Sequence, residues 1–206
     1  MLSGLSVELR FLGGSGDDGL EPFGLADFDD SAFVEDGETF ADNARKKAEY
    51  YYELFDRRWP TMGEDSGILV DALEGELGVK TRRWGAGEKA TDEAWIAYFM
   101  DVMSAVPEGE RGAKFVCNAC LVGLEGEDLQ FEGETRGVIT AELETPIAAG
   151  IPLSSCFRPE GFEEVYQSLS VEEKNGISHR GKALKELRRA ALRSEFFTGW
   201  DLGTPE

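Results

Sequence analysis

The stretch Gly63-Glu64-Asp65-Ser66-Gly67-Ile68-Leu69-Val70-Asp71 carries two adjacent carboxylates, followed by a Ser-Gly pair and an apolar run. Serine and glycine are typical of turns, so the stretch predicts an acidic turn that leads into an apolar segment. Carboxylate oxygens are the ligands that hard cations such as Mg²⁺ prefer, and a turn brings neighbouring oxygens together. Such a turn can hold a metal.

The composition indicates a folded protein that binds neither nucleic acid nor a membrane. Of its 206 residues, 41% are hydrophobic and 11% aromatic, which is enough for one sizeable domain or two lobes that share a cleft. Forty-one acidic and 21 basic residues give a formal net charge of −20. The electric field of this negative charge repels polynucleotides and anionic lipids. The acidic excess itself is explained at least as well by solubility or a salty environment as by a function. An anionic small ligand needs a locally basic site or a divalent cation.

The cysteines and the absence of targeting signals favour a cytoplasmic protein. Cys117, Cys120 and Cys156 are expected to be buried, reduced thiols, because the chain has no second Cys-x-x-Cys pair and only one histidine to complete a zinc site. No basic segment followed by an apolar one opens the chain, and no apolar run approaches about 18 residues. We therefore expect neither export nor a membrane span.

Local patterns predict the segments on both sides of the acidic turn. Strands are expected at residues 7–12 and 20–28, joined by a glycine-rich connector at 13–19. Glycines break up residues 75–87, which predicts a mobile and locally basic loop. Thr91 is suited to cap a helix that follows this loop.

An amphipathic helix is predicted from Glu38 to a stop near Trp59. Asn43 and Lys47 are one turn apart on it, so both side chains are expected to point the same way. From the spacing alone, a solvated partner of a nearby acid is the favoured interpretation of Lys47.

The second half of the chain predicts a hairpin and a C-terminal helix. Residues 113–124 and 129–141 have the character of consecutive strands joined by an acidic turn. Ser178 is the natural N-cap of the last helix, which puts His179 and Arg180 in its first turn. Free backbone N–H groups there also point toward an electronegative ligand.

Five segments in order along the chain resemble the inosine triphosphate pyrophosphatase family. They are residues 37–48, 64–73, 85–93, 111–117 and 172–184, within a similarity that runs from about residue 35 to 192. Several spaced motifs in one order are more specific than any single motif, so the chain is identified as a divergent member of this family.

The resemblance implies an α/β fold with a long, twisted, mixed central sheet flanked by helices, in two lobes with an active-site cleft between them. It also implies one domain over residues 1–197, a flexible tail at 198–206 and a homodimer. Members of the family hydrolyse ITP, dITP and XTP to the monophosphate and pyrophosphate with Mg²⁺. The same substrates and the same metal are expected here, since a triphosphate needs a divalent cation with hard oxygen ligands.

The resemblance also assigns roles to individual residues. Glu35 and Asp65 match metal-binding positions, and Asp65, Glu64 and Lys47 match the catalytic group. The substrate-binding positions are Asn43, Lys47, Ser66, Lys174, Ser178, His179 and Arg180. A hydrogen-bond donor in the site would pair with the keto oxygen at the six position of the purine. The amino group of adenine at that position is itself a donor, so the donor of the site would be left unpaired, at a cost of about 1–3 kcal/mol if it is buried.

Two segments depart from the family pattern. Residues 13–19 lack the asparagine and lysine that grip the triphosphate, and residues 150–155 lack the phenylalanine that stacks on the base and the aspartate that helps to select it. Three interpretations stay open. In the first, the chain is a working pyrophosphatase in which Lys80, Arg82 or Arg83 replaces the lost contacts. In the second, it is a catalytically impaired (d)ITP sensor for a partner effector protein, for instance in a nucleotide-signalling defence system. In the third, it is a structural relic that binds nothing.

Overall fold

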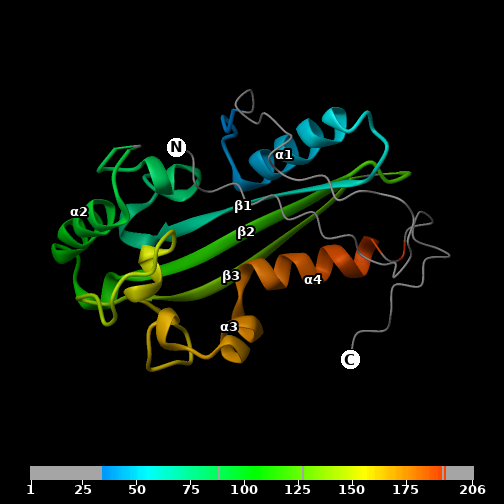
Figure 1. Cartoon of the computed structure of the whole chain (residues 1–206). Helices are drawn as coiled ribbons and strands as arrows, with labels where there is room; N and C mark the ends of the chain where they lie inside the picture. Colours follow the sequence, from blue (N-terminus) through cyan, green and yellow to red (C-terminus); the bar gives the residue numbers. More distant parts are fainter. Residues whose placement is uncertain (1–33, 88, 127, 192, 194–206) are drawn as a thin grey trace.

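The computed structural model describes residues 34–87, 89–126, 128–191 and 193 (Figure 1). The strands predicted at 7–12 and 20–28, the connector between them and the C-terminal tail lie outside these residues. The helices and strands in chain order are α1 (Phe40–Leu54), β1 (Thr61–Val70), α2 (Asp92–Ser104), β2 (Gly112–Val122), β3 (Leu129–Ile139), β4 (Phe157–Pro159), α3 (Val171–Ile177) and α4 (His179–Ala191). Short 3-10 helices lie between them at Asp71–Leu73 (η2), Gly78–Arg83 (η3), Glu108–Glu110 (η4), Pro152–Ser155 (η5) and Tyr166–Ser168 (η6).

The described strands form one sheet in the order β1-β2-β3-β4, and each pairing is antiparallel. The part of the sheet that the structure describes is therefore antiparallel, whereas a mixed sheet was expected. Strands β2 and β3 are consecutive and pair along nearly their whole length, from Gly112 opposite Val138 to Leu121 opposite Leu129. The predicted hairpin is confirmed.

The stretch predicted to be an acidic turn is the middle of β1, so that prediction is wrong. Ser66 lies opposite Cys117 and Gly67 opposite Val116 in a continuous antiparallel ladder. The glycines are needed for packing. A Cβ atom on Gly63 would overlap the carbonyl oxygen of Ala44 in α1, and one on Gly67 would press on the Gly78 carbonyl oxygen and the Phe40 ring. Glycine here marks a close approach between a strand and a helix, which is its other common use.

Helices α1 and α4 cover opposite faces of the sheet (Figure 1). On one face, Ala44 and Ala48 of α1 pack against Cys120 and Val122 of β2. On the other face, α4 contributes Ala183, Leu187 and Ala191, which pack against Cys117, Ala119 and Leu121. Strand β2 therefore has two buried faces. This explains why its sequence is a nearly continuous apolar run instead of an alternating one.

Helix α1 confirms the predicted amphipathic helix. Thr39 and Asp42 form a capping box at its start, in which each side chain accepts a hydrogen bond from the other residue's backbone N–H. Such a cap stabilises a helix by about 0.5–2 kcal/mol. The helix ends at Leu54, before Asp56 and Arg57, whose positive φ angles turn the chain toward β1.

The largest apolar cluster lies at the α2 end of the sheet. Helix α2 is capped by Thr91, as predicted, and places Trp95 and Phe99 in a stacked pair with ring centroids 5.5 Å apart. Both rings pack with Ile68 of β1 and Phe157 of β4. This cluster anchors the apolar half of β1, and it leaves the polar half of the strand for the site.

Two further predictions concern the segment before α2 and the cysteines. The basic segment predicted to be a loop contains the 3-10 helix η3 at Gly78–Arg83, whose Thr81 hydroxyl contacts the edge of β1 at Ile68. The prediction of buried, reduced thiols is confirmed, since all three cysteines are free and fully buried. In the described part of the chain, no helix has both the length and the apolar character needed to span a bilayer.

Candidate functional site

Strand β1 directs its two adjacent carboxylates to opposite faces of the sheet. Successive side chains of a strand alternate between faces. Asp65 therefore lies on the face covered by α1, where it contacts Lys47, and Glu64 lies on the face covered by α4, where it contacts Arg180. The two carboxylates do not converge on one metal position, as a turn would have required.

On the α1 face, four of the predicted residues come together. The Lys47 ammonium lies 2.6 Å from Glu35 Oε1 and 3.1 Å from Asp65 Oδ1, and it also donates to the backbone carbonyl of Glu64 at 3.1 Å. The Asn43 amide donates to Asp65 Oδ2 at 3.0 Å and accepts a hydrogen bond from Gly37 N at 2.8 Å. The prediction that Asn43 and Lys47 point the same way is confirmed.

This cluster is buried, and its two carboxylates outnumber its one ammonium. Lys47 is only 8% exposed, so it is not the solvated surface partner that its spacing favoured. Burial lowers its pKa, but the hydrogen bond to Glu35 and the charge of Asp65 outweigh that effect, so the pKa of Lys47 is raised and the ammonium is retained. Burial raises the pKa of Asp65, and the charge of Lys47 and the hydrogen bond from Asn43 only partly offset this effect. The three groups carry a net charge of −1.

The oxygens around Lys47 are of the kind that bind magnesium. Two carboxylates and one backbone carbonyl converge on a single cationic atom. No cluster of three or more His, Cys, Asp or Glu side chains suited to a metal occurs among the residues that the structure describes. A Mg²⁺ ion is usually held by one or two carboxylates and completes its shell with water and substrate phosphates. Glu35 and Asp65 therefore fit a magnesium ion that arrives with a phosphorylated ligand.

On the α4 face, Arg180 is fixed by two residues of β1. Its Nε donates to Glu64 Oε2 at 2.9 Å, and its terminal nitrogen lies 3.4 Å from Ser66 Oγ. The Cys117 thiol donates to the same Glu64 oxygen at 3.2 Å. Burial raises the pKa of Cys117 far above its ordinary value, so the thiol stays protonated and remains a donor. The guanidinium is half-exposed and can bind a ligand.

His179 lies beside Arg180 and stacks on an aromatic ring. Its imidazole is 5.2 Å from the Phe115 ring at an interplanar angle of 17°. Nδ1 is buried and has no hydrogen-bond partner. Burial, with help from the Arg180 charge, lowers the pKa of His179 to about 4, so the ring is neutral near pH 7. A neutral imidazole is able to donate or accept a hydrogen bond at its other nitrogen.

The remaining predicted residues support the start of α4. The Ser178 hydroxyl accepts a hydrogen bond from Gly181 N at 3.1 Å, which confirms its predicted capping position. Lys174 donates to the backbone carbonyl of Gln167 at 2.8 Å. In this structure Lys174 therefore links α3 to η6, and the ligand contact expected for it remains a prediction.

Several residues at the site were not singled out from the sequence. Cys117 and Phe115 contact Glu64 and His179, as described above. On the other face, Asn118 lies opposite Asp65 and donates to Glu132 at 3.0 Å, which extends the polar row across β2 to β3. A polar Asn118 within the apolar run of β2 was a detectable signal, because a strand buried on both faces seldom carries an amide without a partner.

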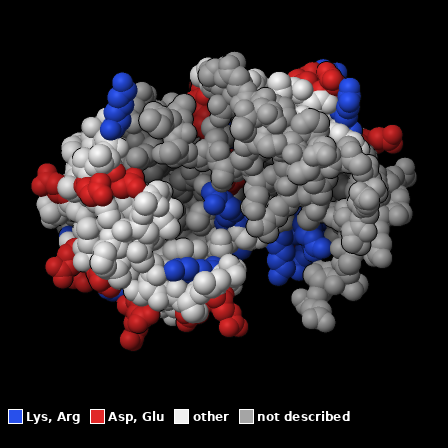
Figure 2. Space-filling model, in the orientation of Figure 1, with Lys and Arg blue, Asp and Glu red and all other residues white. Residues whose placement is uncertain are grey.

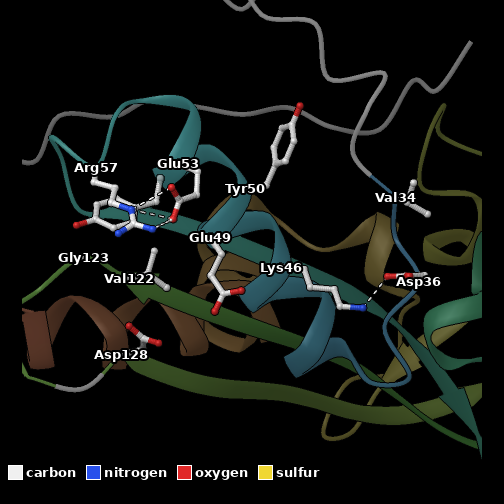
Figure 3. Close-up of a pocket in the computed structure, with 11 residues that line it drawn as sticks. Val34, Asp36, Lys46, Glu49, Tyr50, Glu53, Arg57, Val122, Gly123 and Asp128 are labelled. Atoms are coloured by element: carbon white, nitrogen blue, oxygen red, sulfur yellow. Dashed lines mark hydrogen bonds and ion pairs between the residues drawn. The ribbon is translucent and has the colours of Figure 1, made fainter.

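A cavity of about 710 Å³ on the outer side of α1 is distinct from this site (Figure 3). Its lining includes Lys46, which pairs with Asp36 at 2.6 Å, and Arg57, which pairs with Glu53. None of the predicted site residues lines it. Lys46 and Lys47 thus point to different surroundings, one to an exposed pair and the other to the buried cluster.

Known proteins resemble the chain over most of its length. A model of the Ham1 family matches residues 10–190. A dITP/XTP pyrophosphatase of Geobacter sulfurreducens is 39% identical over 166 residues, which cover 80% of each chain. The residues matched by the family model include both halves of the site described above.

Solved structures agree with the sequence matches. The Ham1 protein of Staphylococcus aureus superposes with a TM-score of 0.69 at 31% identity, over 81% of each chain. A nucleoside-triphosphatase / dITP/XTP pyrophosphatase from Mycobacterium abscessus gives a TM-score of 0.64 at 35% identity, over 84% of this chain and 86% of that one. The family resemblance inferred from the sequence motifs is confirmed, and the chain belongs to the Ham1 family.

Proposed function

We propose that the protein is a Mg²⁺-dependent pyrophosphatase that hydrolyses dITP, XTP and ITP to the monophosphate and pyrophosphate. The observation that carries this proposal is the convergence of Glu35, Asp65 and Lys47, which supplies oxygen ligands and a cation for a triphosphate. The similarity to proteins named dITP/XTP pyrophosphatase over four fifths of the chain supports the choice of substrate.

The chemistry at the α1 face follows from the states of the side chains. A bound Mg²⁺ would neutralise phosphate charge and orient the phosphate oxygens. Asp65 is held by Asn43, and its raised pKa makes it a stronger base than an ordinary carboxylate, so it is suited to orient and deprotonate the attacking water. Lys47 keeps its proton and is suited to neutralise a phosphate oxygen.

The selectivity for deaminated purines is assigned to the α4 face. Arg180 offers only donors, and Glu64 and Ser66 restrict its orientation. A keto oxygen at the six position of the purine accepts from such a donor, whereas the amino group of adenine does not. Because Glu64 and Asp65 are adjacent in one strand, β1 fixes the purine-recognising group relative to the phosphate-binding group.

Other parts of the family resemblance remain proposals. They are two lobes with a cleft between them, a single domain over residues 1–197, a homodimer and a cytoplasmic location. The alternative of a catalytically impaired (d)ITP sensor that acts on an effector protein also remains a prediction. The assay below distinguishes this sensor from the enzyme.

The test is to incubate the purified protein with Mg²⁺ and dITP, ITP, XTP, dATP or dGTP, and to measure nucleotide binding and pyrophosphate release separately. We expect release from dITP, ITP and XTP, with Asp65→Asn losing about 100-fold or more of the rate. Asp36→Asn, which changes an exposed carboxylate outside the cluster, is the matched control and should retain activity. Tight binding without release would support the sensor, and no binding of any triphosphate would exclude both functions.

A further inference from the structure

We infer that, without a ligand, the Lys47 ammonium holds the position between Glu35 and Asp65 that a divalent cation takes, so that the cation and Lys47 exclude one another there. Free metal then binds weakly, and metal bound to a triphosphate binds well. This inference rests on the metal requirement of the proposed function. It adds that the metal enters together with the triphosphate and not before it, which the metal ligands alone do not specify.

The contacts of the ammonium support this role. An ammonium has three donors, and three oxygens accept from Lys47: one from Glu35, one from Asp65 and the backbone carbonyl of Glu64. The distances of 2.6 to 3.1 Å are those of hydrogen bonds and not of metal coordination. These oxygens are also the hard ligands that a divalent cation requires. One set of ligands therefore serves two alternative cations.

The charge balance favours the exchange. Two carboxylates and one ammonium leave a net charge of −1 in a buried cluster, whereas the same carboxylates with a divalent cation are neutral.

The displaced ammonium needs a new partner. The Lys47 stem is held between α1 and β1, because its Cβ lies against Gly63 where the helix and the strand are closest. Only the end of the side chain is then free to move. A buried ammonium without a partner is unfavourable in free energy. Free metal that displaces Lys47 therefore binds more weakly by that free energy. A metal-triphosphate complex brings phosphate oxygens that accept from Lys47, so it avoids this cost.

The test measures binding of free Mn²⁺, a spectroscopic substitute for Mg²⁺, without nucleotide in the wild type, Lys47→Met and Lys46→Met. Both variants remove one lysine charge from α1, but Lys46 pairs with Asp36 beside the outer cavity (Figure 3). We expect Lys47→Met to bind Mn²⁺ at least about tenfold more tightly than the wild type, and Lys46→Met to match the wild type. Equal or weaker binding by folded Lys47→Met would overturn the inference.

A second pair of variants covers the case in which Lys47→Met does not fold. Glu35→Gln is compared with Glu35→Gln/Lys47→Met, which has the same net cluster charge of −1 as the wild type. Removal of Lys47 should again tighten Mn²⁺ binding, and no tightening would overturn the inference. The Mn²⁺-binding assay contains no nucleotide, so its result does not depend on catalysis. If the separate nucleotide assay showed no pyrophosphate release, the proposed function would be contradicted but the result on metal binding would stand.

Discussion

At the residue scale, Glu64 is proposed to act on the site by orienting Arg180, with which it forms an ion pair. Their ion pair spans 2.9 Å, and the two side chains are 32% and 53% exposed. An exposed pair of this kind contributes less than about 1 kcal/mol to stability. Its proposed function is orientation, because Glu64 accepts from one edge of the guanidinium and is itself held by the Cys117 thiol.

Glu64→Gln should therefore reduce kcat/KM for dITP by about tenfold, mainly through KM, and narrow the discrimination between dITP and dATP. Its free energy of unfolding should change by less than about 1 kcal/mol. Steady-state kinetics and urea unfolding measure the two effects. Glu53→Gln is the control, because Glu53 forms a similarly exposed pair with Arg57 outside the site. An equal effect of both substitutions on kcat/KM would contradict a positioning role for Glu64.

His179 gives a second prediction at the residue scale, for stability against pH. Its pKa is about 4 in the folded protein and 6.5 in the unfolded chain, so the unfolded chain binds the proton more tightly. The stability that His179 contributes is present above pH 6.5 and is lost as the pH falls toward 4. His179→Phe keeps the stacking on Phe115 and removes the titration. Between pH 7 and pH 4 the wild type should lose about 1–3 kcal/mol more than this variant.

Urea unfolding at several pH values measures the difference. Carboxylates titrate in both proteins, so their contribution largely cancels in the comparison. Parallel pH profiles for the wild type and His179→Phe would show that the imidazole is not buried as a neutral group.

At the scale of the elements, the packing of α1 on β1 determines the geometry of the site. A Cβ atom on Gly63 would overlap the Ala44 carbonyl and press on the Lys47 stem. Gly63→Ala must therefore push the helix away from the strand, which we expect to reduce stability by about 1–3 kcal/mol. Because Asn43 and Lys47 are carried by the same helix, pyrophosphate release should fall as well.

Gly176→Ala is the matched control for stability. Gly176 lies inside helix α3, and a Cβ atom there meets nothing within 4 Å. Alanine favours a helix over glycine by about 0.5–1 kcal/mol, so this substitution should stabilise the protein. Thermal unfolding of both variants should give shifts of opposite sign. A shift of the same sign for Gly63→Ala would show that α1 does not approach β1 this closely.

The same elements show how far the sequence predicts the structure. Periodicity and capping residues are local, so α1 and the β2–β3 hairpin were predictable, and the helical spacing correctly put Asn43 and Lys47 on one face. The use of Gly63 and Gly67 depends on a helix that packs from another segment, so local turn preference gave the wrong answer. The contact of Cys117 with Glu64 depends on the register of β1 and β2, which no local pattern specifies.

On the scale of the whole molecule, the sheet separates the cluster of Glu35, Lys47 and Asp65, proposed to bind metal and phosphate, from the Glu64–Arg180 pair, proposed to recognise the purine. The protein as a whole is strongly acidic. In Figure 2, acidic side chains lie along the edges of the visible face, while basic side chains lie near its centre and also at its upper left and upper right edges. This distribution agrees with an anionic ligand that approaches a locally basic region. The net charge of −20 must still be held in one compact fold, at a cost in self-repulsion.

Salt should therefore stabilise the protein. Raising NaCl from about 0.01 to 0.15 M shortens the Debye length from about 30 to 8 Å, which screens most repulsion between surface carboxylates. We expect the free energy of unfolding to rise by on the order of 1 kcal/mol over this range. The double variant Glu163→Gln/Glu164→Gln removes two exposed carboxylates outside the site and should show a higher stability at low salt with a smaller rise. A stability that falls with NaCl would mean that attractive ion pairs outweigh the repulsion, so that the acidic excess does not limit the stability of the fold.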